Sequence, residues 1–228
     1  MMKYPAAWLK GNSLGESIAS QLRLQIIRGQ IKSGEILSEN RIASDFGTSR
    51  SPVREALRTL SAEGLIVLQR MGAVVAGLQL KDIIELYDVR YLIESFAWQQ
   101  PDLTNSADLL SRMEQMIDKM ELAAKHQDYV EFTSQDISFH ETMIQASQHA
   151  RIMHLWASIR PIVLTVMLIT NEEVLSRGEE QTKYVINKHR KLISSLQTRD
   201  KSVIQSGIED YFADSRRTLQ ASIKGNTN

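Results

Sequence analysis

Residues 38–77 place helix-starting and helix-ending signals in an order that leaves few folds open. Ser38 precedes an amphipathic segment that ends at Gly47, and Ser49 precedes a second one that ends at Gly64. Serine is favourable just before a helix, and glycine tolerates the left-handed backbone that commonly ends one. The spacing therefore predicts two short helices joined by a tight turn.

Two short apolar segments follow the second of these helices. Residues 65–68 and 73–76 read as strands, and the turn between them ends at Gly72. A small hairpin placed directly after a helix-turn-helix is a wing. Residues 39–58 with this wing therefore predict a winged helix-turn-helix, a motif that places its second helix in the major groove of DNA.

The outward positions of the predicted motif carry hydroxyls and cations. Small hydroxyls and arginines at a helix N-terminus suit phosphate oxygens and guanine edges in a major groove. The alternative is that the arginines are only the solvated face of a helix pair, which the combined order of cap, turn, helix and wing disfavours. The DNA-contacting residues expected from the sequence are Ser49, Arg50, Ser51, Arg54 and Arg70.

Charge is distributed in a way that supports this assignment. The 228-residue chain has 27 Lys and Arg against 27 Asp and Glu, so it is neutral overall. Residues 1–77 hold ten basic and six acidic residues, and the remainder is correspondingly acidic. A basic first part is what a nucleic-acid partner requires.

Composition also narrows the class of protein. Cysteine is absent, which excludes a disulfide framework and thiol chemistry. Residues 1–10 lack the apolar core of a signal peptide, and the longest apolar run, residues 159–170, is too short to span a bilayer. We expect a cytoplasmic protein without a membrane segment. No Ser-His-Asp set, phosphate loop or His-Glu-x-x-His motif occurs, so an enzyme is not expected.

The hydrophobic pattern of the sequence changes after Gly77. Everything to about residue 223 has a helical pattern, with no convincing strand, and Pro161 is expected to kink the helix that contains it. The predicted breaks lie near residues 101–106, 125–128, 147–150, 171–178 and 198–200. We predict a mostly α protein with a winged helix-turn-helix domain at residues 1–78 and an all-helical bundle at residues 79–228.

Two of the predicted bundle helices carry polar residues where their periodicity asks for apolar ones. Asp136 and His140 lie one turn apart in the inward stripe of one helix, and His189 lies in the inward stripe of another. Burying such groups is costly unless they are paired. Carboxylate oxygen and imidazole nitrogen suit Zn, Mn or Ni, so these residues are candidate metal ligands. Hydrogen bonding among them around a bound ligand is the open alternative.

Two arginines are candidates for contacting an acidic ligand. Arg90 follows Ile83 and Tyr87 on a predicted inward face, and an arginine fork directed into a cavity suits a carboxylate. An ion pair with Glu94, one turn on, or with an acid of a second subunit is equally open. Arg160 is the second and weaker candidate.

Several motifs resemble those of the GntR family of bacterial repressors. They are the segments Gly34-Glu-Ile-Leu-Ser-Glu-Asn, Ser49-Arg-Ser-Pro-Val-Arg-Glu-Ala-Leu and Glu63-Gly-Leu-Ile. A winged helix-turn-helix domain followed by a helical bundle resembles the domain order of the fatty-acid-regulator-like subfamily, whose members carry an FCD domain. The resemblance implies a homodimeric repressor of an operator with an inverted repeat, whose bundle binds the effector and forms the dimer.

The resemblance also implies roles for individual residues. Arg50 and Arg54 would read or clamp DNA, Asn40 and Arg41 would lie at its backbone, and Gly72 would lie at the wing tip. Many members of the subfamily bind a metal through an aspartate, a histidine one turn later and two further histidines. Asp136, His140 and His189 match the first three positions, whereas Tyr211 stands at the fourth, where its phenol would be a weak ligand or an effector contact.

A narrower likeness within the family covers residues 4–96 and returns at residues 135–144. It implies that the effector is D-gluconate, which would release the repressor from the operon of sugar-acid use that it controls. A regulator of the same fold that responds to lactate, a hexuronate or an acyl ligand remains the alternative.

Overall fold

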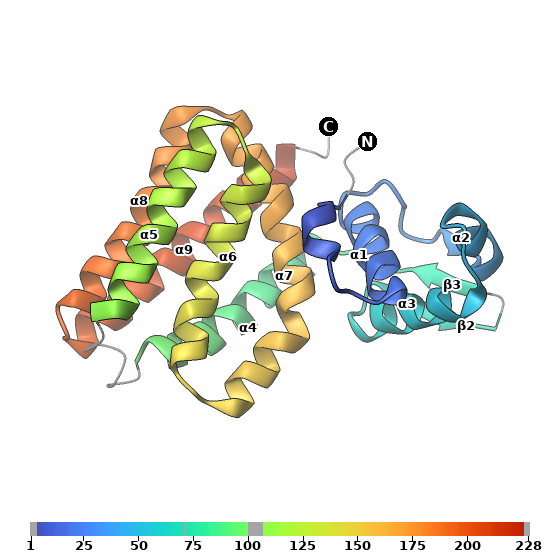
Figure 1. The fold of residues 1–228 in the computed structure, drawn as a ribbon, viewed down its shortest axis with the longest axis horizontal. Helices are drawn as coiled ribbons and strands as arrows, with labels where there is room; N and C mark the ends of the chain where they lie inside the picture. Colours follow the sequence, from blue (N-terminus) through green and yellow to red (C-terminus); the bar gives the residue numbers. More distant parts are fainter. Residues whose placement is uncertain (1–3, 71, 100–106, 226–228) are drawn as a thin grey trace. The chain divides into compact units, whose positions relative to one another are not determined.

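The computed structural model describes residues 4–70, 72–99 and 107–225 (Figure 1). The predicted fold class is confirmed, since these residues form mainly helices together with one small sheet. The chain divides into two compact units, residues 1–79 and residues 80–228.

The first unit is a winged helix-turn-helix. Its helices are η1 (Ala6–Leu9), α1 (Leu14–Ile27), α2 (Glu39–Asp45) and α3 (Arg50–Ala62). Its strands are β1 (Ile36–Leu37), β2 (Ile66–Gln69) and β3 (Gly72–Val75), which form an antiparallel sheet in the order β1-β3-β2. The sequence did not predict β1, because two residues are too few to show the alternation of a strand.

Local signals explain where the helices of this unit begin and end. Ser13 and Glu16 form a reciprocal capping box at the start of α1. Ser38 and Ser49 occupy the predicted positions before α2 and α3, but their side chains make no cap hydrogen bond. Gly47 has a φ of +60° and ends α2 as expected.

A tight approach of two strands constrains the wing. Gly72 has a φ of +141°, and a Cβ atom there would lie 3.0 Å from the carbonyl oxygen of Leu37. Glycine is therefore required where β3 begins, beside β1. The predicted turn also includes Met71, which lies outside the described residues.

Helix α3 has one buried and one exposed face. Its buried residues are Val53, Ala56, Leu57 and Leu60, which belong to a single core with side chains of α1 and the sheet. Burial of this stripe fixes the rotation of α3 about its axis. Its arginine face is consequently exposed to solvent.

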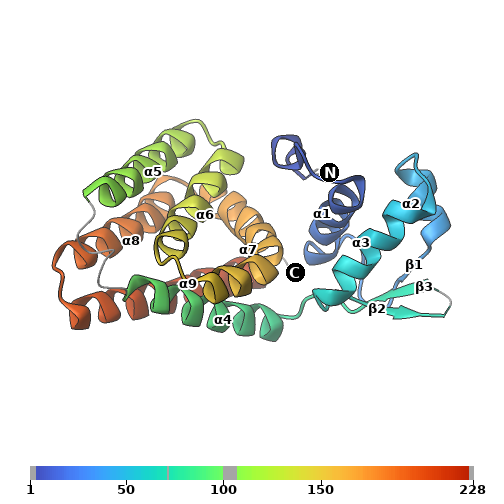
Figure 2. The same ribbon diagram turned by 60° about the horizontal axis from the view of Figure 1, so that its bottom comes forward.

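The second unit is a bundle of helices (Figure 2). Its described residues form α4 (Leu80–Trp98), α5 (Ala107–Lys125), α6 (Tyr129–Ala146), α7 (Ala150–Ser176), α8 (Glu179–Gln197) and α9 (Lys201–Gly225). Helix α6 packs against α4, α5 and α7, while α8 packs against α5 and α9. The predicted break at residues 101–106 lies outside the described residues.

Helix α7 differs from its prediction. The expected break at residues 171–178 was wrong at its start, because the helix continues to Ser176. Pro161 lies inside this helix, as predicted. Helix α7 is the one described helix that is long and apolar enough to cross a membrane by length and composition. Asn171 and much of its apolar surface are buried within the bundle, so it is a core helix of this unit.

Candidate functional site

Three exposed arginines lie one turn apart along α3. They are Arg50, Arg54 and Arg58. The Nε atom of Arg54 lies 2.9 Å from Glu39 Oε2, whereas Arg50 and Arg58 form no ion pair within the described part of the chain. Sequence reasoning did not single out Arg58, although its spacing from Arg54 repeats that between Arg50 and Arg54.

The remaining predicted DNA contacts are distributed over α2, the turn and the wing. Asn40, Arg41, Ser49, Ser51 and Arg70 are all exposed, and Gly72 is half-buried. Arg41 lies 3.9 Å from Asp45 in an exposed ion pair of the kind that contributes little to stability. These side chains are free to exchange their partners for phosphates, and their roles at DNA stay predictions.

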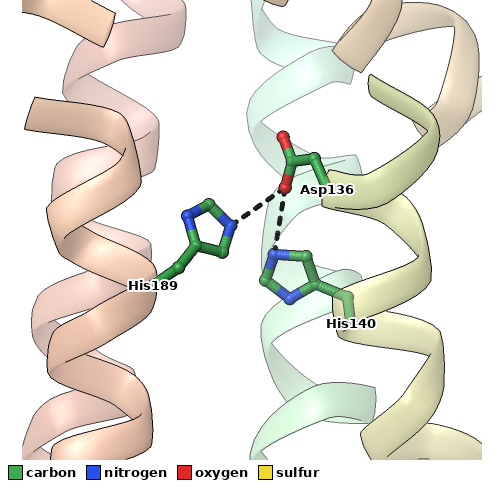
Figure 3. Close-up of side chains that lie close together, drawn as sticks. All are labelled: Asp136, His140 and His189. Atoms are coloured by element: carbon green, nitrogen blue, oxygen red, sulfur yellow. Dashed lines mark hydrogen bonds and ion pairs between the residues drawn. The ribbon is translucent and has the colours of Figure 1, made fainter. Parts of the chain in front are cut away.

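The structure brings the three predicted metal ligands together inside the bundle (Figure 3). Asp136 and His140 project from α6 and His189 from α8, and one potential ligand atom of each lies within 4.8 Å of the others. Asp136 Oδ1 is 3.0 Å from His189 Nε2 and 3.5 Å from His140 Nε2. All three side chains are buried.

Glu94 of α4 links this group to the predicted effector arginine. Its Oε2 lies 2.5 Å from His140 Nδ1, and its Oε1 accepts a 2.5 Å hydrogen bond from Arg90 Nε. Burial raises the pKa of Glu94, but Arg90 and His140 outweigh burial and hold this pKa below its ordinary value. The sequence offered Glu94 only as an ion-pair partner of Arg90, and its contact with His140 was missed.

Proton positions in this cluster follow from its acceptors. The ionised Glu94 and the carbonyl of Val185, 2.9 Å from His189 Nδ1, can only accept hydrogen bonds. Burial lowers the pKa of His189, although Asp136 opposes the shift, so the imidazole is neutral with its proton on Nδ1. The Nε2 atom of His189 then directs a lone pair toward Asp136 Oδ1, and the Nε2 atom of His140 faces the same oxygen.

The hydroxyl of Tyr211 lies close to the Nε2 atoms of both histidines. It is 2.8 Å from His140 Nε2 and 3.2 Å from His189 Nε2. Burial and then the charge of Asp136 raise the pKa of Tyr211 well above its ordinary value, so the phenol is neutral. The phenol hydroxyl can donate its one proton to only one of the two Nε2 atoms at a time.

The donor set therefore fits a cation. Oδ2 of Asp136 is satisfied by Asn171, whose Nδ2 lies 2.9 Å away, but Oδ1 faces the Nε2 atoms of both histidines. A divalent ion would satisfy Asp136, His140 and His189 together, and Glu94 and Val185 hold both imidazoles in the required tautomer. Asn171 was missed because it fell within a predicted helix break.

A small cavity of about 40 Å³, which opens toward solvent, adjoins this cluster. It is lined by Tyr87, Arg90, Asp136, Met167, Thr170, Asn171, Val174, Val185, Lys188, Tyr211, Ser215 and Thr218. Arg90 Nη2 is buried and has no hydrogen-bond partner. The predicted ion pair with Glu94 uses the Nε atom of Arg90. The Nη2 atom of the same side chain remains available to a ligand in the cavity.

Lys188 of α8 is a second cation in the cavity wall, and sequence reasoning missed it. Its Nζ is 3.2 Å from Ser215 Oγ and 5.1 Å from the centroid of the Tyr211 ring. Burial lowers the pKa of Lys188 to about 8. A signal existed, since Lys188 is spaced three residues from the inward Val185 and four from the inward Leu192.

Arg160, the weaker of the two predicted effector contacts, lies away from the cavity. Its guanidinium pairs with Glu141 of α6, which also accepts a hydrogen bond from Trp156, and Arg160 does not line the cavity. Its side chain is 41% exposed. The helical position of Arg160 turns it to the surface, because Ile162, Val163 and the following residues occupy the buried face.

Family comparisons match both units. Residues 14–75 match the bacterial regulatory proteins of the gntR family, and residues 85–213 match the FCD domain. Two relatives match over 211 residues, which is 92% of this chain and 87% of each relative. They are the gluconate operon transcriptional repressors of Bacillus subtilis (strain 168), 38% identical, and Bacillus licheniformis, 36% identical.

A solved structure shares the fold. E. coli McbR/YncC aligns with a TM-score of 0.68 at 18% identity, over 92% of this chain and 98% of that one.

Proposed function

Because the chain belongs to the GntR family and carries an FCD effector domain, we propose that it represses a sugar-acid operon and that D-gluconate releases it from the operator. The family and the relatives are transcriptional regulators rather than enzymes. The names of the two Bacillus relatives support gluconate as the effector. A bacterial regulator of this kind acts on chromosomal DNA in the cytoplasm.

The lining of the cavity is the main support for an effector site in the bundle. Arg90 Nη2 offers an unpaired cationic donor for a carboxylate, while Thr170, Ser215 and Thr218 supply hydroxyls along the wall. A polyhydroxy carboxylate matches both features. An acyl effector is disfavoured, because its chain offers no hydroxyl that could pair with the polar groups of this wall.

A divalent metal held by Asp136, His140 and His189 is part of the proposal. When bound, it would supply a Lewis acid for the carboxylate and an adjacent hydroxyl of the effector. The protein's own residues orient the ligands: Glu94 accepts from His140 Nδ1 and the Val185 carbonyl accepts from His189 Nδ1. The neutral Tyr211 hydroxyl can donate to an oxygen of the bound effector.

The first unit would read the operator as one half of a homodimer on an inverted repeat. An effector that binds one arrangement of the bundle better than another would shift the repressor from the DNA-bound to the free state. The coupling needs about 1.4 kcal/mol for a tenfold change, which is within the usual range.

Arg50 is expected to contribute more to operator binding than other exposed arginines. It lies in the first turn of α3 without an intramolecular partner among the described residues, so no ion pair has to be broken when it meets DNA. Arg50→Ala should weaken binding by about 1–3 kcal/mol and relax base preference at one position. Fluorescence anisotropy with operator variants measures both effects, and Arg112→Ala on α5 is the matched control. Wild-type affinity for Arg50→Ala would refute the recognition-helix assignment.

D-Gluconate is expected to weaken operator binding by about tenfold or more, whereas D-glucose, which lacks the carboxylate, should have little effect. Arg90→Lys is the informative variant, because its ammonium can still pair with Glu94 while the free Nη2 is lost. This variant should bind the operator normally and remain bound when gluconate is added. Anisotropy titrations at fixed salt measure the response.

Two outcomes would count against this proposal. Equal release by glucose and gluconate would show that the carboxylate is not the recognised group. Operator binding that no sugar acid changes would overturn the effector class, and the assignment to the GntR family would be unaffected.

A further inference from the structure

Lys188 is a buried cation without an anionic partner. Only 7% of the residue is exposed, yet the one hydrogen-bond partner of its Nζ among the described residues is the neutral Ser215 hydroxyl. The remaining close groups are the faces of two aromatic rings, those of Tyr184 and Tyr211. A buried ammonium of this kind is costly unless something compensates its charge.

The neighbouring carboxylates are already engaged elsewhere. Both oxygens of Glu94 are bound, one by Arg90 and the other by His140. Asp136 accepts from Asn171 through Oδ2 and faces the two imidazoles through Oδ1. The acids of the described cavity region therefore make no direct ion pair with Lys188, although the charge of Asp136 acts on it from a distance.

The ammonium of Lys188 belongs to the inner cavity. Lys188 and Tyr211 also border a groove on the outer side of α8 and α9, which Asp210 and Asp214 line. Ser215, which contacts the Nζ atom, lines the inner cavity and not that groove. Neither aspartate of the groove forms an ion pair with Lys188.

The cavity wall thus has two cationic donor atoms that make no hydrogen bond to an anion among the described residues, supplied by different helices. Arg90 Nη2 comes from α4, and Lys188 Nζ comes from α8. The charge of Arg90 is already paired with Glu94, and a ligand whose one carboxylate accepts from Arg90 Nη2 leaves Lys188 without an anionic partner. We propose that Lys188 recognises a second anionic group, and that the effector which fits this cavity best is a sugar acid with an acidic group at each end.

This inference rests on the proposed function, since it takes the same cavity as the effector site and refines the class of ligand. The second anionic group can be a carboxylate or a phosphate, because both accept hydrogen bonds from an ammonium. D-Glucarate and 6-phospho-D-gluconate are suitable probes. Each shares the carboxylate and the hydroxylated chain of D-gluconate and adds one of the two groups.

Isothermal titration calorimetry on the full-length protein, with the metal content with which it is purified, tests the proposal. We expect at least one of the two dianions to bind the wild type tenfold or more tightly than D-gluconate. Lys188→Met should remove this advantage, so that the dianions and D-gluconate bind the variant with affinities within about threefold of each other. Lys191→Met, an exposed lysine on the same helix, should leave all three affinities unchanged.

Folding of the variant can be checked independently. Replacing a buried ammonium that makes no direct ion pair by an apolar side chain of similar length should leave the melting temperature at or above that of the wild type. If Lys188→Met does not fold, Lys188→Gln provides the neutral variant for the same titrations.

The outcomes separate this inference from the proposed function. Equal affinity of the wild type for gluconate and both dianions would overturn it, as would a loss of all three ligands to the same extent in Lys188→Met. Binding of a dianion without binding of gluconate would support the inference and refute gluconate as the effector. If none of the three binds, both are wrong.

Discussion

Replacing Glu94 by alanine is expected to reduce the free energy of unfolding of the bundle by about 3–5 kcal/mol, which is typical when one partner of a buried ion pair is removed. The guanidinium of Arg90, of which only 2% is exposed, would lose its only carboxylate partner among the described residues. His140 Nδ1 would lose its acceptor at the same time. Urea unfolding followed by tryptophan fluorescence measures the change.

Two further variants make the result interpretable. Glu121→Ala breaks an exposed ion pair with Arg190 and should cost less than about 1 kcal/mol. The double variant Arg90→Met with Glu94→Leu removes both charges and should recover much of the loss, because two apolar groups replace the pair. A stability of Glu94→Ala within 1 kcal/mol of the wild type would contradict the buried network.

Substituting His140 by alanine is expected to abolish metal binding. Losing a ligand should weaken the affinity by more than the roughly 10–100-fold that loss of a supporting residue costs. Wild-type protein prepared without chelator should contain near-stoichiometric Zn, Mn or Ni by elemental analysis, and the variant almost none. The melting temperature should fall, because the ligand bonds stabilise only the folded state.

A chelator separates this effect from the loss of packing at residue 140. EDTA should lower the melting temperature of the wild type and leave that of His140→Ala unchanged. If the wild type contains no metal and EDTA has no effect, the converging acceptors are satisfied by hydrogen bonds alone, with Tyr211 as the donor.

The sequence predicted those parts of the site that depend on periodicity within one helix. Asp136 and His140 are four residues apart, so their shared inward face followed from helix geometry alone. The contact between Glu94 and His140 depends on how α4 packs against α6, which no local pattern records. For the same reason, the sequence could not decide whether Arg90 pairs with Glu94 or contacts a ligand.

Misread local signals account for other differences. Asn171 has a residue type common in turns, so the break was placed too early, although packing of α7 against several helices keeps it helical there. Strand β1 exists because β3 offers it a partner, with Ile36 opposite Val74. Lys188 was missed, although its spacing from Val185 and Leu192 places it near the inward face of α8, because a lysine is seldom buried.

The wall of the cavity combines side chains from five helices, α4, α6, α7, α8 and α9, each of which contributes between one and four residues. The groups proposed to hold the metal are Asp136 and its buried partners, while positions such as Thr170, Val174 and Thr218 form other parts of the wall. A change at any of these three alters the space available to a ligand without changing the groups proposed to hold the metal. New specificities can therefore arise by single substitutions on separate helices, so that this bundle is readily adapted to different acids.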